Sequence, residues 1–284
     1  EFMSEARLLS DSLMAESQQR VYLCTENTEN LLKSMLALWM HGAVAVPLNP
    51  QIPEKQKMEM LQKIDCTFSY KELLHEFKSH PRSVNSLQPN PVGNSDAVAG
   101  KEVNSINPKD WATIIFTSGS TGSPKAVVHS LANHFFSALG ANERMPLNPG
   151  DRWLLSLPVY HVSGLAILFR TLLSGAAMVI PAKNVSLSKT LQSRNITHLS
   201  LVPTQLHRLL QTTKGKDALC QLKLILLGGA SIPETLLEQS AQLGLNVQTT
   251  YGSTEMASQV ATGKSGFYQV LPFREVRIAA DNEV

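Results

Sequence analysis

The sequence predicts an α/β fold in which mainly parallel sheets are flanked by helices and arranged in two lobes. Short apolar runs of strand length alternate along the chain with longer segments whose apolar residues recur at helical spacing. Such alternation is typical of parallel sheets, which bind ligands at the carboxyl ends of their strands. The stretch from Ser79 to Pro108, rich in Pro, Ser, Asn and Gly, interrupts this pattern and reads as a linker. We therefore assign residues 1–100 to a first lobe with its linker and residues 101–284 to a second lobe.

The first lobe is expected to alternate strands and helices. The strands are expected at Val21–Cys24, Ala43–Val46 and Cys66–Tyr70, and the helices at Glu29–His41 and from Pro53 to about Ile64. Gly42 ends the first of these helices, and Pro53 suits the first turn of the second.

The second lobe repeats the alternation on a larger scale. Its expected strands are Trp111–Thr117, Ala126–Val128, Trp153–Leu157, Ala177–Ile180, His198–Leu201, Lys223–Leu227 and Val247–Tyr251. Its expected helices are Leu131–Arg144, Ser163–Leu173, Thr204–Gln211 and Pro233–Leu243.

The composition is that of an ordinary globular protein, with 43% hydrophobic and 17% charged residues in 284. A net charge of +2 gives no large electropositive footprint, so we expect no nucleic-acid partner. Cys24, Cys66 and Cys220 lie far apart without a C-x-x-C pair, which favours reduced thiols and a cytoplasmic location. Because Arg170 interrupts the longest apolar stretch, Val162–Ile180, we expect no membrane span.

One segment of the second lobe combines hydroxyls, glycines and a lysine directly after a predicted buried strand. It reads Thr117-Ser118-Gly119-Ser120-Thr121-Gly122-Ser123-Pro124-Lys125. Glycines allow close backbone approach, hydroxyls and amides donate hydrogen bonds, and the lysine adds positive charge. The segment therefore suits a polyphosphate, and a solvated turn is the alternative. A Walker A loop is excluded, because Pro124 precedes Lys125 and the glycine spacing differs.

Two further strand ends carry residues suited to a nucleotide. Tyr251-Gly252-Ser253-Thr254-Glu255 offers an aromatic face, a hydroxyl for a phosphate and a carboxylate for magnesium. Gly228-Gly229-Ala230-Ser231 leaves bare backbone against which a planar ring could lie, before a helix that begins near Pro233. The alternatives are a strand-to-helix turn with a helix cap and a tight βα turn.

Arg170 stands alone among apolar residues in the predicted helix Ser163–Leu173. A buried guanidinium needs an anionic or carbonyl partner, and no Asp or Glu occurs between Asp151 and Asp217. The sequence thus predicts either a bidentate clamp for a substrate carboxylate or an arginine that reaches solvent or a distant acid.

Together these segments resemble the motifs of the adenylate-forming superfamily, which includes acyl-CoA synthetases, luciferases and peptide-synthetase adenylation domains. The resemblance implies that ATP phosphates bind at Thr117, Ser118, Gly119, Ser120, Thr121, Gly122 and Lys125. It implies that adenine and AMP contact Gly228, Gly229, Ala230, Ser231, Thr250, Tyr251, Gly252 and Ser253. His161, Thr254 and Glu255 are then catalytic, with Glu255 also holding Mg²⁺.

The same resemblance bears on the acid substrate. His161 and Gly164 match the H-x-x-G of acyl- and aryl-CoA synthetases, and the Asp typical of amino-acid-activating domains is missing between Pro158 and Gly164. Residues 153–164, 200–206 and 226–232 resemble the o-succinylbenzoate–CoA ligases of menaquinone biosynthesis. This implies that an aromatic dicarboxylic acid is adenylated by ATP and passed to CoA, with His161, Gly164, Arg170 and Ser200 contacting the acid.

The resemblance covers nearly the whole chain but only the large N-terminal domain of the family. Members continue beyond Val284 to a ribose-binding Asp, a hinge and a C-terminal domain with an adenylation lysine, so we expect this chain alone to show little full activity. The family's glycine-bearing segment before Leu271 is also altered here, reading Gly266–Val270. Another acyl- or aryl-CoA synthetase and a non-catalytic adenylate-binding module stay open as alternatives, and so does a homo-oligomer.

Overall fold

The computed structural model describes residues 2–12, 17–66, 68–69, 107–117, 123–264 and 267–278, and it divides into two compact units, Glu1–Leu131 and Ala132–Val284. The sequence placed the boundary after residue 100. The observed division falls later because the strands β4 (Trp111–Thr117) and β5 (Lys125–Ser130) complete the sheet of the first unit. Most of the predicted linker, Ser79–Pro108, lies outside the described residues.

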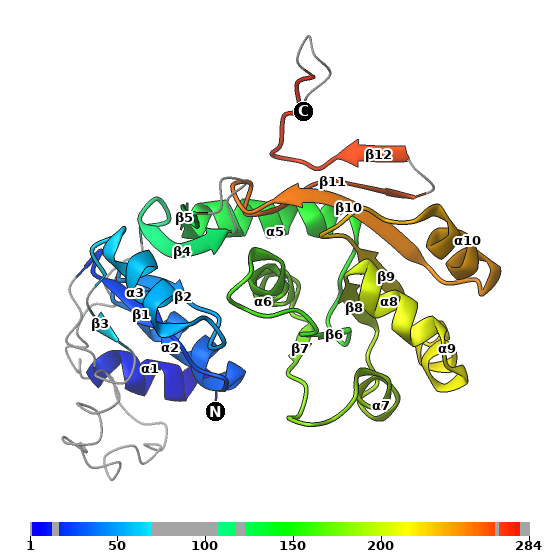
Figure 1. The fold of residues 1–284 in the computed structure, drawn as a ribbon, viewed down its shortest axis with the longest axis horizontal. Coiled ribbons are helices and arrows are strands. Elements are labelled where there is room, and N and C mark those ends of the chain that lie inside the picture. The colour runs from blue at the N-terminus through cyan, green and yellow to red at the C-terminus, as the bar shows by residue number, and fades with distance from the viewer. Residues whose placement is uncertain are drawn as a thin grey trace, which may run out of the picture. The chain divides into compact units, whose positions relative to one another are not determined.

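The first unit contains a five-stranded sheet in the order β3-β1-β2-β4-β5 (Figure 1). Its other elements are α1 (Phe2–Ser12), β1 (Arg20–Leu23), α2 (Thr28–Met40), β2 (Val44–Pro47), α3 (Glu54–Gln62) and β3 (Phe68–Ser69). All strand pairs are parallel except β4 with β5.

Local sequence signals explain the ends of α2. The side chain of Asn27 caps its first turn by accepting a hydrogen bond from the Asn30 amide at 3.1 Å. Gly42 follows the helix with φ of +71°, a left-handed conformation that glycine adopts without strain. The predicted end of this helix is therefore confirmed.

The second unit contains a seven-stranded sheet in the order β12-β11-β10-β9-β8-β6-β7. Its strands are β6 (Arg152–Leu154), β7 (Ala177–Val179), β8 (His198–Leu201), β9 (Leu224–Leu227), β10 (Val247–Ser253), β11 (Ser258–Lys264) and β12 (Phe267–Val270). Its helices are α5 (Leu131–Arg144), α6 (Val162–Ser174), α7 (Leu187–Ser193), α8 (Pro203–Leu210), α9 (Thr213–Cys220) and α10 (Glu234–Gln242). The sheet is parallel from β10 to β7, whereas β11 and β12 are antiparallel.

The core of the second unit forms where the apolar runs of β8 and β9 meet the apolar faces of α8, α9 and α10. Leu199, Leu206, Leu219, Leu227 and Leu236 belong to this buried cluster. All four residues of both strands are buried, as expected for central strands of a sheet covered on both faces. This packing fixes the strand ends on which the predicted ligand-binding residues lie.

The predicted α/β class with mainly parallel sheets is confirmed. Four elements of the second unit, α7, α9, β11 and β12, were not predicted from the sequence. In the described residues, no helix is both long and apolar enough to cross a membrane.

Candidate active site

The predicted phosphate loop connects β4 to β5 in the first unit. Thr117 and Lys125 face each other as the last registered pair of this antiparallel hairpin. The Lys63 ammonium donates to the Ser123 hydroxyl and lies 3.5 Å from the Pro124 carbonyl oxygen. The central loop residues of the prediction, Ser118, Gly119, Ser120, Thr121 and Gly122, lie outside the described residues.

The predicted adenine segment begins where β9 ends. A Cβ atom on Gly228 would lie 2.4 Å from Thr250 Cγ2 and 2.9 Å from the Thr250 carbonyl oxygen. Gly229 has φ of +83°, and both Ala230 and Ser231 are exposed. Gly228 therefore allows β9 to approach Thr250 of β10 closely, and the exposed residues that follow it are accessible to a ligand.

Residues 251–255 lie at the end of β10 and in the turn that leads to β11. The structure thus forms a β-hairpin here and not the strand-to-helix turn that was the alternative. The pairing shifts register between Tyr251 and Gly252, and a Cβ atom on Gly252 would lie 2.1 Å from the Ser258 carbonyl oxygen. Tyr251 is half-exposed, which leaves its ring free to stack on a planar ligand.

The turn itself carries Thr254 and Glu255. The Ala257 amide donates to the Thr254 carbonyl oxygen at 2.9 Å, and the Glu255 side chain is exposed. Magnesium is usually bound by one or two carboxylates together with substrate phosphates, so Glu255 fits an ion that enters with ATP. Within the described residues, no group of three or more His, Cys, Asp and Glu could hold a metal ion by itself.

His161 is the N-cap residue that precedes α6. Its backbone is extended, with φ of −106° and ψ of 144°, and its side chain does not cap the helix. A Cβ atom on Gly164 would lie 2.2 Å from the Pro158 carbonyl oxygen, so glycine is required for the chain to turn tightly into the helix. Partial desolvation of the imidazole lowers the pKa of His161 and favours its neutral form.

Arg170 is 2% exposed on α6, and its partners are neutral. Its Nη2 group donates to Gln259 Oε1 and to Ser258 Oγ, the latter at 3.4 Å, and its Cζ atom lies 5.3 Å from the Trp153 ring centroid. The Nε group has no hydrogen-bond partner among the described residues. Burial lowers the pKa of Arg170 to about 10, so the guanidinium is still charged at neutral pH.

Ser200 belongs to the same cluster, and its link to Arg170 runs through Trp153. Its hydroxyl accepts a hydrogen bond from Trp153 Nε1 at 3.1 Å, and the Trp153 ring lies beside the guanidinium. The structure thus brings Arg170 and Ser200 together through Trp153. The sequence did not identify Trp153, Ser258 or Gln259, because no local pattern marks a strand residue as the partner of a distant helix.

One chain of side chains connects the acid and adenine residues within the second unit. Gln259 Nε2 donates to Thr250 Oγ1 at 2.9 Å, and Thr250 is the residue that packs against Gly228. Gln259 therefore contacts both Arg170 and a residue predicted to contact AMP.

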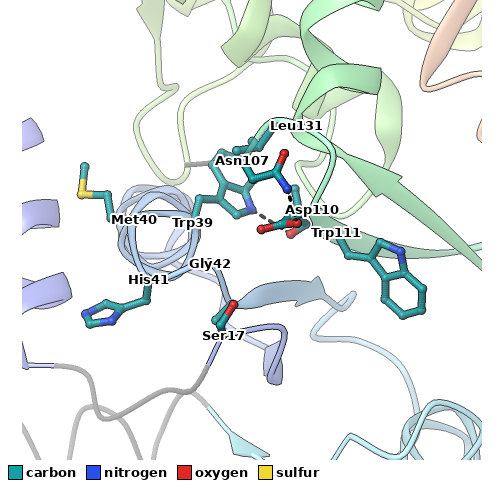
Figure 2. A pocket seen from close by; sticks show the side chains of 11 residues that line it. Ser17, Trp39, Met40, His41, Gly42, Asn107, Asp110, Trp111 and Leu131 are labelled. Carbon is teal, nitrogen blue, oxygen red and sulfur yellow. Dashed lines mark hydrogen bonds between the residues drawn. The ribbon is translucent and has the colours of Figure 1, made fainter. Parts of the chain in front are cut away.

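Two cavities lie elsewhere. Figure 2 shows one in the first unit, of about 310 Å³, lined by residues such as Trp39, Asn107 and Asp110. The Trp39 indole N–H donates to the Ala112 carbonyl oxygen at 2.7 Å, and Asn107 Nδ2 donates to Asp110 Oδ1 at 2.9 Å. A groove of about 440 Å³ lies between α8 and α10 in the second unit. The described residues that line these two cavities include none of those predicted for the site.

Comparison with known proteins decides the family. The family model described as AMP-binding enzyme matches residues 1–279. The chain belongs to the AMP-binding enzyme family. This membership agrees with the resemblance inferred from the phosphate-loop, glycine and Tyr251–Glu255 segments.

Relatives of the chain carry a consistent name. It is 40% identical over 268 residues to a 2-succinylbenzoate–CoA ligase of Salmonella typhimurium, and 93% of this chain and 55% of the relative are aligned. It is 32% identical over 284 residues to the ligase of that name from Staphylococcus aureus, with 91% and 57% aligned. The chain thus spans about half the length of the curated relatives it matches.

A solved structure shows the same fold. An arginine-to-lysine variant of Escherichia coli MenE with bound OSB-AMS is 33% identical to this chain and superposes with a TM-score of 0.77. The superposition covers 99% of this chain and 61% of the relative. The fold is therefore that of the large N-terminal part of these enzymes, as the sequence predicted.

Proposed function

We propose that this chain supplies the nucleotide- and acid-binding part of an AMP-forming ligase that joins 2-succinylbenzoate to CoA, a step of menaquinone biosynthesis. The observation that carries the proposal is Arg170, a buried and charged guanidinium with neutral partners and an unpaired Nε group. A second carboxylate on the substrate would supply the missing anion. The relatives named 2-succinylbenzoate–CoA ligase act on a dicarboxylic acid, which fits this site.

The proposed reaction has two steps. In the first, an oxygen of the succinyl carboxylate bonds to the α-phosphorus of ATP and pyrophosphate leaves. In the second, the thiol of CoA attacks the acyl carbon, loses its proton and releases AMP. Both reactants of the first step are anionic, so the protein must neutralise charge and hold them in line.

Each segment has a proposed task. The loop 117–125 binds the β- and γ-phosphates, and residues 228–231 and 250–253 receive adenine. Thr254 donates to the α-phosphate, and Glu255 holds Mg²⁺, which offsets phosphate charge when it is bound with ATP. The neutral imidazole of His161, with Gly164, contacts the acid at the start of α6.

Arg170 and Ser200 are proposed to recognise the benzoate carboxylate. Arg170 would bind it directly through its free donor, whereas Ser200 would act through Trp153. A hydrogen bond to a charged group is worth about 1.5–3 kcal/mol, which corresponds to roughly 10- to 150-fold in affinity. This margin is large enough to discriminate dicarboxylic from monocarboxylic acids.

The test is calorimetric titration of this chain with two matched acyl-adenylates. One is 2-succinylbenzoyl-AMP, activated on the succinyl carboxylate, and the other is 4-oxo-4-phenylbutanoyl-AMP, which differs only in lacking the benzoate carboxylate. We expect the wild-type chain to prefer the first by tenfold or more, and Arg170→Met to lose that preference. Equal affinity of the wild-type chain for both ligands would refute the proposed substrate and favour another acyl- or aryl-CoA synthetase.

Activity needs a separate measurement. In pyrophosphate release by the ligase that contains this chain, 2-succinylbenzoate should be preferred over benzoate and fatty acids. Binding of the adenylates without any acid-dependent release of pyrophosphate would instead favour a non-catalytic adenylate-binding module. A cytoplasmic location and a homo-oligomer stay predictions from the sequence.

A further inference from the structure

Gln259 is buried on β11 with its amide fixed in one orientation. Its Nε2 group donates to Thr250 Oγ1 at 2.9 Å. The Thr250 hydroxyl has only one proton, and it donates that proton to the Ala261 carbonyl oxygen at 3.1 Å. Thr250 can therefore only accept from Gln259, so the amide nitrogen must face Thr250. The amide oxygen then faces Arg170, where it accepts from Nη2.

The backbone of Gln259 is held from another direction by Arg274. Arg274 Nε donates to the Gln259 carbonyl oxygen at 3.3 Å, and its Nη2 group donates to the Met256 carbonyl oxygen at 3.0 Å. These contacts join the turn after β10 to the first residues of β11. Both the main chain and the side chain of Gln259 are thus fixed before any ligand arrives.

The neutrality of Gln259 matters as much as its position. Gln259 Oε1, Ser258 Oγ and the Trp153 ring hold the guanidinium of Arg170 without cancelling its charge. A glutamate here would make a stronger, charge-assisted bond and would occupy the positive charge that a ligand needs. A neutral acceptor therefore orients Arg170 and leaves its charge available.

We propose that Gln259 is a positioning residue that aims the Arg170 guanidinium at the second carboxylate of the substrate and so sets the preference for dicarboxylic acids. This inference rests on the function proposed above. Gln259 acts through Arg170 and takes no part in bond making. Its contact with Thr250 also ties the orientation of Arg170 to the strand end predicted to receive AMP.

Two substitutions separate this role from a purely structural one. Gln259→Glu keeps an acceptor for Arg170 but neutralises its charge, whereas Gln259→Met keeps the side-chain length and removes both amide groups. A structural role alone predicts that the glutamate variant binds ligands normally, since Arg170 retains a partner. The positioning role predicts that both variants lose the preference for the dicarboxylate.

The experiment measures the affinity ratio for 2-succinylbenzoyl-AMP over 4-oxo-4-phenylbutanoyl-AMP by calorimetry. We expect this ratio to fall about tenfold or more in both variants. Gln239→Glu on the exposed surface of α10 introduces the same charge away from Arg170 and should keep the ratio within about twofold of wild type. Circular dichroism and urea unfolding of each variant show that folded protein is compared.

The two proposals can fail separately. If the wild-type chain has no preference for the dicarboxylate, the proposed substrate is wrong. If wild type prefers it, Arg170→Met abolishes the preference and a folded Gln259→Met variant, which has no acceptor for Arg170, retains it, then Gln259 does not position Arg170 and the inference is overturned.

Discussion

Replacement of Gly228 by alanine tests the close approach of β9 and β10. The new Cβ atom would lie 2.4 Å from Thr250 Cγ2, about 1 Å inside an ordinary van der Waals contact, and 2.9 Å from the Thr250 carbonyl oxygen. The Thr250 side chain cannot rotate away freely, because its hydroxyl accepts a hydrogen bond from Gln259 Nε2 at 2.9 Å and donates one to the Ala261 carbonyl oxygen at 3.1 Å. The clash therefore has to be relieved by movement of a strand.

The expected cost follows from two opposing effects. Overpacking of a well-packed site costs about 1–3 kcal/mol, whereas replacing glycine by alanine stabilises by about 0.4–1 kcal/mol through the unfolded chain. The difference between these ranges is about 0–2.6 kcal/mol, and because the Cβ atom would lie only 2.4 Å from Thr250 Cγ2 we expect Gly228→Ala to lower the free energy of unfolding by roughly 1–2.5 kcal/mol. Urea unfolding followed by circular dichroism measures this change.

A double-mutant cycle isolates the contact. Thr250→Ser removes the Cγ2 methyl and keeps the hydroxyl, so it should recover part of the loss caused by Gly228→Ala. We expect a coupling energy of about 1 kcal/mol. Additivity within about 0.5 kcal/mol would show that the methyl is not what excludes a side chain at position 228, and the reasoning would be refuted.

Three further predictions concern buried polar groups of the second unit. Trp153→Phe removes the indole donor to Ser200 and should lower the free energy of unfolding by about 1–3 kcal/mol; an unchanged urea midpoint would contradict this. Burial lowers the pKa of His198 in the folded protein, so the unfolded chain binds a proton more readily. The free energy of unfolding should therefore fall as the pH drops through about 6.5, the pKa of histidine in the unfolded chain. His198→Asn should reduce that pH dependence, and an unaltered slope between pH 7.5 and 5.5 would count against it. Burial opposes ionisation of Asp151, but Lys223 Nζ at 2.6 Å and the Asn148 amide outweigh it and lower the pKa; Lys223→Met should raise the carboxyl pKa measured by NMR.

The hydrophobic pattern of the sequence predicted the bounds of two interior strands correctly, because the buried residues of each strand lie within one short segment. The bounds predicted for β4 and β8, Trp111–Thr117 and His198–Leu201, are those observed. β4 contains the apolar run Ile114-Ile115-Phe116, and in β8 Leu199 and Leu201 alternate with His198 and Ser200; both strands lie in the interior of their sheets. The predicted helix Leu131–Arg144 also has the observed bounds.

The antiparallel edge of the second sheet was missed for a physical reason. β11 reads Ser258-Gln-Val-Ala-Thr-Gly-Lys264 and contains polar residues, and β12 is exposed along its length. Their strand conformation depends on the pairing of β11 with β10 and of β12 with β11, and not on an apolar pattern. The sequence therefore ended its strand assignments at Tyr251.

The candidate site was predictable as a set of segments but not as a set of contacts. Arg170 stood out because a charge in an apolar helix needs a partner, and its burial is confirmed. The identity of the partners was beyond the sequence, because Gln259 lies 89 residues away on a strand that was not predicted. The roles assigned to the nucleotide segments remain predictions.

The hairpin between β10 and β11 limits how the sequence can vary in length. Four turn residues, Thr254 to Ala257, separate the two strands, and side chains along a strand alternate between its faces. One inserted or deleted residue that shifted β11 by a single position would turn Gln259 to the opposite face of the sheet, away from Arg170 and Thr250. Length changes in this turn should therefore be tolerated far less than substitutions of its exposed side chains, and a library of one-residue insertions at 254–257 would expose that difference.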